Sequence, residues 1–517
     1  MQVRVLQGNP FDQATDLIIL PITKGKNVLR GQAAVFRKLL DAGMVAHVDK
    51  SALEGSLGEW LVLPTYGSAK AGFVALLGAG ERGSITADTY RRLGALSTKK
   101  ARELRAKNVA TAWTALPSSF LTAREAAMAF AEGAHLAAYG FHAYHKRNAD
   151  RHAKAKLKTL TVYESSAVSL AAIERGFAEA AVIAEATCLA RDLVNTPSQD
   201  MTPAHMVEVA KDIAASSKRL SIKTFDRERM ERMKMHATLA VARGSEHEPV
   251  GVHMTYRPDV RGQMSDARGM KGKGRVKRIV VVGKAVTFDS GGLSLKLGDG
   301  MTTMKIDMAG AATVLGLFKA LPELAPNVEV HGIFLAVENM PSGKAYRPGD
   351  VVRAMNGSTI EVLNTDAEGR VTLADALSYA ATLKPDAIID LATLTGACVV
   401  ALGEEIAGVM GTDRKLLDRL KLSAEASGES IWELPMPAAY EDHVKSKIAD
   451  VKNVGAKGQA GAISAALFLK HFVPSEIPWA HLDIAGPSYT EREIRPDQPP
   501  GASGFGVRLL MRYLQAL

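Results

Sequence analysis

The chain has 517 residues, of which 47% are hydrophobic and 23% charged, and its formal net charge is +9. This length exceeds what one hydrophobic core can organise, so we expect at least two domains of ordinary globular composition. Two cysteines exclude a disulfide framework and a zinc site built from cysteines. The first residues contain no apolar signal core and no apolar run reaches membrane-spanning length, so we expect a cytoplasmic protein with no membrane association.

The positive charge is concentrated in two segments. Six basic residues against Asp150 give segment 146–158 a net charge of +5, and eight against Asp259 and Asp266 give segment 257–278 a net charge of +6. Neither segment interleaves aromatic side chains, as a surface that stacks single-stranded bases would. They are interpreted as solvated loops, with an accessory role in binding nucleic acid or another acidic partner as the alternative.

The first 165 residues predict a small α/β domain. Short apolar runs bounded by turn residues are typical of buried strands, and longer stretches between them are typical of helices. The expected strands are 16–22, 72–77 and 159–163, and the expected helices are 86–96 and 123–139. A dinucleotide-type glycine pattern at 78–83 follows a strand, but helix signals begin only at Thr86, so we expect no phosphate site there.

A connecting helix is expected within 166–195, because the helical pattern over 171–193 ends at Asn195-Thr196-Pro197. The remaining residues, 196–517, predict a larger α/β domain with a mixed, mainly parallel central sheet flanked by helices. Continuous β-branched runs such as 278–282 are typical of parallel central strands. The other expected strands are 328–336, 360–363, 386–391 and 481–484, and the expected helices are 308–321, 370–383, 413–427 and 461–472.

The most informative stretch is 364–371, Asn-Thr-Asp-Ala-Glu-Gly-Arg-Val, at an expected strand-to-helix junction. In open α/β sheets, ligands bind at such carboxyl ends of strands. Asp366 and Glu368 suit carboxylates that share metal ions, and Arg370 suits a bidentate anion site. The alternative is a helix N-terminus with acids in its first turn and an arginine ion pair. The stretch alone does not decide between them.

A second cluster follows the 278–282 strand. Lys284 lies at its carboxyl end, Asp289 in a turn permitted by Gly291-Gly292, and Lys296 in the same segment, while Asp307 begins a helix rich in small residues. Individually these are explained as surface lysines and a helix cap. Together with Asp366 and Glu368 they offer many hard oxygen ligands, which favours a pair of divalent ions.

With these residues in view, the chain closely resembles the leucyl (cytosol) aminopeptidases, a family of dinuclear-metal exopeptidases. The resemblance is strong over about 190–517 and loose in the N-terminal domain. It is carried by 364–370, by Gly283-Lys284 to Gly292, by Lys296 and Asp307, and by the stretches 338–343, 346–350, 391–397 and 502–508.

The resemblance implies a set of roles. Lys284, Asp289, Asp307, Asp366 and Glu368 match the metal ligands, Lys296 and Arg370 match the catalytic side chains, and Met304, Thr393 and Ala485 match the pocket for the first side chain. It further implies peptide substrates with leucine-like first residues, two Mn²⁺ or Zn²⁺ ions per subunit, bicarbonate at Arg370 and a homohexamer. Two rivals remain: a non-catalytic or nucleic-acid-binding protein on this fold, and another metallohydrolase such as a phosphoesterase.

Overall fold

The structure is a computed structural model that describes residues 1–25, 28–29, 34–37, 40–113, 116, 121–145, 157–259 and 275–517. Most of the two basic segments, 146–156 and 260–274, lies outside these residues. The chain divides into two compact units. Unit 1 comprises Met1–Glu185 and Arg492–Pro499, and unit 2 comprises Ala186–Glu491 and Pro500–Leu517. The division falls inside the long helix α6, Ala167–Asn195.

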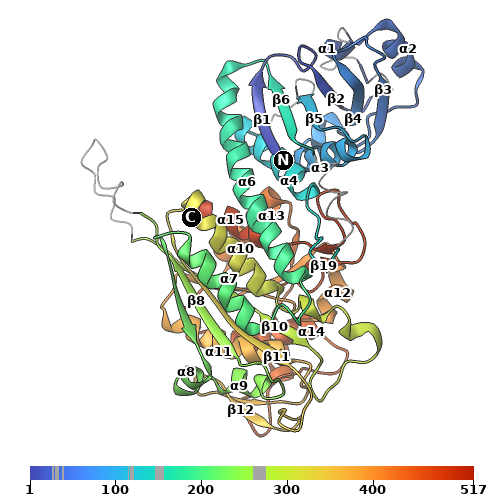
Figure 1. Ribbon diagram of the computed structural model, residues 1–517. Coiled ribbons are helices and arrows are strands. Elements are labelled where there is room, and N and C mark those ends of the chain that lie inside the picture. Colours follow the sequence, from blue (N-terminus) through green and yellow to red (C-terminus); the bar gives the residue numbers. More distant parts are fainter. Residues whose placement is uncertain are drawn as a thin grey trace. The chain divides into compact units, whose positions relative to one another are not determined.

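Unit 1 is built on a six-stranded sheet of order β1-β6-β5-β2-β4-β3 (Figure 1). All neighbouring strands are parallel except the β3–β4 pair. The expected strands at 16–22, 72–77 and 159–163 are confirmed as β2, β4 and β6. The bounds are β1 Gln2–Gln7, β2 Thr15–Ile22, β3 Trp60–Pro64, β4 Ala71–Gly78, β5 Asn108–Ala112 and β6 Thr159–Glu164.

Apolar cores cover both faces of this sheet. One contains Phe130 and Phe177 from the helices α4 and α6, and the other contains Met44 and Val48 from α2. Helix α3 begins after a 3₁₀ turn at Arg82–Ser84, so no helix follows the 78–83 glycine pattern directly, as expected. The helices are α1 Ala34–Arg37, α2 Ala42–Lys50, α3 Ala87–Glu103, α4 Ala123–Ala137 and α6.

Unit 2 contains a nine-stranded mixed sheet of order β16-β15-β18-β14-β9-β11-β8-β7, with β10 paired to β11. The strands β18, β14, β9 and β11 run parallel, and antiparallel strands flank them. The bounds are β7 Leu220–Phe225, β8 Val250–Tyr256, β9 Arg278–Gly283, β10 Ala285–Asp289, β11 Glu329–Asn339, β14 Ala387–Ala392, β15 Ala407–Gly411, β16 Ile431–Glu433 and β18 Trp479–Asp483.

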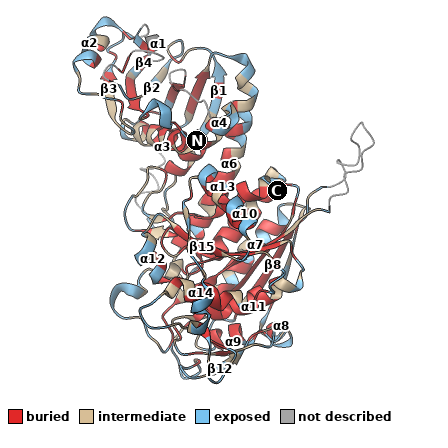
Figure 2. Ribbon diagram, turned by 180° about the vertical axis from the view of Figure 1, so that it is seen from behind, coloured by how far each residue is buried: buried red, intermediate tan, exposed pale blue. Residues whose placement is uncertain are grey.

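Helices pack on both faces of this sheet, and its central strands β9, β11, β14 and β18 are largely buried (Figure 2). On one face lie α7 Pro203–Ala215, α10 Ala309–Leu324, α13 Arg414–Ser427 and α15 Val507–Gln515. On the other lie α9 His236–Ala242, α11 Glu368–Thr382 and α14 Gly461–Lys470. Shorter elements are α8 Arg227–Arg232, α12 Gly396–Leu402, β19 Tyr489–Thr490 and β20 Gly501–Ala502.

The expected fold class is therefore confirmed, with one correction among the central strands. Segment 360–363 does not belong to the central sheet. Its strand, β13 Thr359–Glu361, pairs with β12 Val351–Arg353 and β17 Val451–Lys452 in a separate three-stranded sheet. A short apolar run predicts a strand but carries no information about its partners. Among the described residues, no helix is both long and apolar enough to cross a membrane.

Candidate active site

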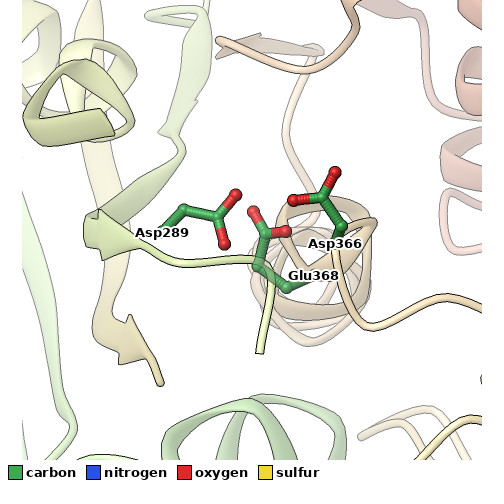
Figure 3. Close-up of side chains that lie close together, drawn as sticks. All are labelled: Asp289, Asp366 and Glu368. Atoms are coloured by element: carbon green, nitrogen blue, oxygen red, sulfur yellow. The ribbon is translucent and has the colours of Figure 1, made fainter. Parts of the chain in front are cut away.

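Three carboxylates converge in unit 2 from two separate parts of the chain. Asp289 ends β10, Asp366 lies in the turn before α11, and Glu368 is the first residue of α11. One ligand oxygen from each lies within 4.8 Å of the other two, and Figure 3 shows the three side chains around one centre. The sequence-based hypothesis that Asp366 and Glu368 share a centre with Asp289 agrees with this geometry.

The turn after Asp289 depends on two glycines. Gly291 and Gly292 have φ of +87° and +61°, a region that side chains with a Cβ rarely adopt. This conformation lets the Gly291 N–H donate to Asp289 Oδ1 at 2.8 Å. The local sequence therefore fixes one oxygen of Asp289 and leaves Oδ2 for other partners.

Lys284 and Asp307 lie beside these carboxylates. Lys284 Nζ is 2.6 Å from Asp307 Oδ1 and 2.9 Å from Glu368 Oε1, and it donates to the carbonyl of Thr393 at 3.0 Å. Lys284 directly follows β9, and Asp307 follows the short 3₁₀ helix Met304–Ile306. All three charged side chains are buried. The five residues matched to metal ligands in the sequence thus form one connected cluster.

Lys296 lies on the more exposed side of this cluster. Its Nζ contacts Asp289 Oδ2 at 2.8 Å and Asp366 Oδ1 at 2.5 Å. Burial opposes its charge, but Asp289 and Asp366 outweigh burial and raise the pKa of Lys296. The side chain of Lys296 is therefore positively charged at neutral pH and is held in place by the carboxylates of Asp289 and Asp366.

Arg370 is almost fully buried, and one nitrogen is oriented by the backbone. Its Nη1 donates to the carbonyl of Asn453 at 2.8 Å. Burial lowers the pKa of Arg370 to about 10, while Glu368 and Asp483 act in the opposite direction. The guanidinium remains charged at neutral pH, so this buried cation is suited to receive an anion.

The carboxylates carry the electrostatic signature of a cation site. Burial and the nearby Asp289 raise the pKa of Glu368 well above its ordinary value, and burial raises the pKa of Asp307 to about 6. Asp307 Oδ2 and Glu368 Oε2 are buried and have no hydrogen-bond partner among the described residues. Buried acceptor oxygens of this kind are costly unless something positive meets them. Divalent cations fit this donor set.

The amine of Lys284 would have to be neutral to act as a ligand. Burial favours the neutral form, but Asp307, Glu368 and Asp289 outweigh burial and raise the pKa of Lys284. A divalent cation among the same carboxylates would reverse that balance, because it replaces the ammonium as their counter-charge. Lys284 would therefore become available as a ligand only if a cation displaced its proton.

Of the three residues expected to line the substrate pocket, Met304 and Thr393 contact Asp307 of the cluster. Thr393 Oγ1 donates to Asp307 Oδ1 at 2.7 Å, and the half-buried Met304 accepts from the Asp307 N–H at 3.3 Å through its carbonyl. Ala485, also half-buried, donates its N–H to Asp483 Oδ1 at 3.2 Å. Thr393 therefore positions a carboxylate, and its role in a pocket stays a prediction.

Sequence reasoning missed the polar side chains that support the cluster. Asn339 ends β11 and its side chain donates to Asp289. The side chain of Asn453 donates to the carbonyl of Asn364 at 2.6 Å, while its backbone carbonyl accepts from Arg370. Both asparagines are fully buried. A signal existed for Asn339, since it is a polar residue at the carboxyl end of a strand whose middle, 332–337, is apolar.

Comparison with known proteins shows the family of the chain. Residues 188–511 match the catalytic domain of the cytosol aminopeptidase family, and residues 19–148 match its N-terminal domain. The chain belongs to the cytosol aminopeptidase family. It is 41% identical to a probable cytosol aminopeptidase of Persephonella marina, over 99% of both chains. It is 42% identical to one of Aquifex aeolicus, over 89% of this chain and 88% of the relative.

Solved structures of similar proteins have the same fold. A mutant of tomato leucine aminopeptidase is 35% identical, with a TM-score of 0.85, over 100% of this chain and 97% of the other. The bottromycin maturation enzyme BotP in complex with Mn is 34% identical, with a TM-score of 0.82, over 97% and 99% of the two chains. Membership of this cytosol aminopeptidase family supports aminopeptidase activity, that is, hydrolysis of peptide bonds.

Proposed function

We propose that the protein releases N-terminal amino acids, leucine-like ones preferentially, from peptides by a mechanism that uses two divalent ions. The observation that carries the proposal is the convergence of Asp289, Asp366 and Glu368 within 4.8 Å, with Lys284 and Asp307 against them. Two ions held by these five residues would polarise the scissile carbonyl and lower the pKa of a water molecule enough for attack. Mn²⁺ and Zn²⁺ are the proposed ions.

The chain's own cations have separate tasks in this proposal. The ammonium of Lys296 is fixed by Asp289 and Asp366 and would stabilise the negative charge that develops on the carbonyl oxygen. The guanidinium of Arg370, oriented through Asn453, would bind a planar anion, for which we propose bicarbonate. Met304, Thr393 and Ala485 are proposed to shape the pocket for the first side chain.

The free α-amine of the substrate explains why such an enzyme would act only at the N-terminus. A neutral amine is a good ligand for Mn²⁺ or Zn²⁺, and an internal residue has no such group to offer. An apolar pocket would then discriminate between neighbouring side-chain sizes only modestly, by roughly 10–200-fold per methylene.

The test is hydrolysis of leucine p-nitroanilide with added Mn²⁺ or Zn²⁺, before and after treatment with a chelator. We expect turnover that the chelator abolishes and that either ion restores. The variant Glu368→Ala should lose both turnover and bound metal while it remains folded. The exposed Glu248, which pairs with Arg227, provides the control Glu248→Ala, expected to behave as wild type. Turnover by Glu368→Ala with tightly bound metal would contradict the proposal.

A homohexamer in the cytoplasm is part of the same proposal and rests on the family resemblance. Light scattering is expected to give a mass about six times that of the 55.1 kDa chain. No observation on the described residues favours the nucleic-acid alternative.

A further inference from the structure

Asn339 connects the two ligand-bearing loops through one amide group. Its side chain is fully buried at the end of β11. Its Nδ2 donates to Asp289 Oδ1 at 2.7 Å and to the carbonyl of Thr365, next to Asp366, at 3.0 Å. Since both partners can only accept, the hydrogen-bond network assigns the NH₂ group to this side of the amide.

The same two loops are joined by further hydrogen bonds around Thr365. The Tyr346 hydroxyl also donates to the Thr365 carbonyl, at 3.0 Å. Thr365 Oγ1 donates to the carbonyl of Gly291 at 2.7 Å and accepts from the Ser294 N–H at 2.8 Å. The segments 289–294 and 364–366 are therefore held as one unit, and Asn339 differs from Tyr346 in that it also donates to the carboxylate of Asp289.

The donation from Asn339 determines which oxygen of Asp289 faces the centre. Asp289 Oδ1 receives two N–H groups, from Gly291 and from Asn339. Asp289 Oδ2 is left to contact Lys296 Nζ at 2.8 Å. Rotation of the carboxylate out of its observed plane would break both donations, so the two N–H groups fix the orientation of the carboxylate.

The amide of Asn339 fits in this position because the residue opposite it, Gly292, has no side chain. A Cβ added to Gly292 would lie 2.9 Å from Asn339 Oδ1 and 3.1 Å from Thr365 Oγ1. The oxygen of the amide therefore packs directly on the glycine turn that follows Asp289. The position of the amide is set by this contact and by the two hydrogen bonds of its NH₂ group.

We propose that Asn339 is a positioning residue that sets the affinity of the cluster for divalent ions, by fixing Asp289 in rotation and holding it at a constant separation from Asp366. The inference rests on the proposed two-ion function. Groups that orient metal ligands from behind typically change metal affinity 10–100-fold when they are removed. Asn339 touches neither ion nor substrate in this scheme and acts only through Asp289 and the 364–366 loop.

The decisive variant is Asn339→Leu, which keeps the shape of the side chain and removes the donor. Protein stripped with a chelator is titrated with Mn²⁺ by calorimetry, which gives both the affinity and the number of competent sites. We expect Kd to rise about 10–100-fold with the site number unchanged. A role in folding alone would lower the number of competent sites and leave Kd unchanged, and that result would overturn the inference.

A second variant covers the case in which Asn339→Leu does not fold. Tyr346→Phe removes the other donor to the Thr365 carbonyl and nothing else, so Kd for Mn²⁺ should rise by a smaller factor, about 2–10-fold for one hydrogen bond. The control is Asn356→Ala, which removes an exposed asparagine whose Oδ1 accepts from the Ser358 N–H at 3.0 Å. Its Kd should equal that of wild type.

Failure of the inference and failure of the proposed function are distinguishable in these experiments. Wild-type protein that binds no Mn²⁺ and shows no chelator-sensitive turnover would refute the proposed function. Wild-type protein that does both would refute only the role of Asn339 if Kd is unchanged in folded Asn339→Leu, or unchanged in Tyr346→Phe where Asn339→Leu does not fold.

Discussion

At the scale of single residues, the cluster depends on a position where a side chain is absent. Gly369 follows Glu368 in the first turn of α11. A Cβ at this position would lie 2.3 Å from Lys284 Cε and 2.6 Å from Lys284 Nζ. The lysine thus occupies the space that any other residue at 369 would fill, and its approach to Glu368 requires glycine there.

The variant Gly369→Ala is therefore expected to displace Lys284 while the helix persists, because alanine favours helix. A displacement of about 1 Å at a catalytic group costs roughly 100-fold in rate, so kcat/KM for leucine p-nitroanilide should fall by about that factor or more. Gly396→Ala is the matched control, since Gly396 begins α12 and a Cβ there meets nothing within 4 Å. Wild-type kinetics for Gly369→Ala would show that Lys284 tolerates the displacement.

At the scale of elements, the neighbouring strands β8 and β11 are linked by a row of hydrogen-bonded polar side chains. His253 bonds Tyr379 at 2.9 Å through Nδ1 and His331 at 2.8 Å through Nε2. His331 in turn bonds Glu329 at 3.0 Å. Burial lowers the pKa of His253 to about 3, and the charges of His331, Lys223 and Arg257 act in the same direction.

The lowered pKa of His253 predicts that the stability of unit 2 depends on pH. The unfolded chain binds a proton at His253 with a pKa of about 6.5, and the folded protein does not, so the free energy of unfolding should fall as the pH falls from about 6.5 toward 3. The slope from one such group is at most about 1.4 kcal/mol per pH unit. His253→Gln keeps a hydrogen-bonding group that does not titrate and should flatten this slope.

Urea unfolding at pH 7, 6, 5 and 4 measures the effect. The exposed His236 in α9 provides the control His236→Gln, expected to keep the wild-type slope. If the free energy of unfolding depends on pH with the same slope in His253→Gln and in wild type, the assignment of this dependence to His253 is contradicted.

At the scale of the whole molecule, a C-terminal segment completes the N-terminal unit. Residues Arg492–Pro499 belong to unit 1, although unit 2 contains the chain on either side of them. Arg495 Nη2 donates to Asp88 Oδ1 in α3 at 2.5 Å, and Arg495 Nε donates to Asp497 Oδ1 at 3.2 Å. Asp88 also pairs with Arg91, which pairs with the buried Glu132. Unit 1 therefore depends on residues distant in sequence.

Arg495→Met should destabilise unit 1, because it leaves Asp88 and the buried Asp497 with one cation fewer. Breaking one side of a buried ion pair costs about 3 kcal/mol. Hydrogen exchange should show the loss of protection in α3 and β5 and not in β9 or β14. Arg414→Met removes an exposed arginine that pairs with Asp418 and Glu433, and it should change protection little. Uniform loss of protection in both units would contradict the assignment to unit 1.

The sequence by itself determined much of this protein. It predicted the α/β class, the strands at 278–282 and 386–391, and the residues Asp289, Asp366 and Glu368, because local periodicity and motif spacing are written in neighbouring residues. The domain limits 1–165, 166–195 and 196–517 stay predictions. So do the assigned roles of the site residues.

Only the tertiary structure decided which distant groups meet. It placed β13 in a separate sheet, brought Asn339 to Asp289 and Asn453 to Arg370, and included Arg495 in unit 1. Strand pairing and buried hydrogen bonds join residues tens to hundreds of positions apart, and a local pattern carries no information about such partners. The motifs along the chain therefore indicated which residues carry the chemistry of the site, whereas the hydrogen bonds that orient those residues depend on the fold.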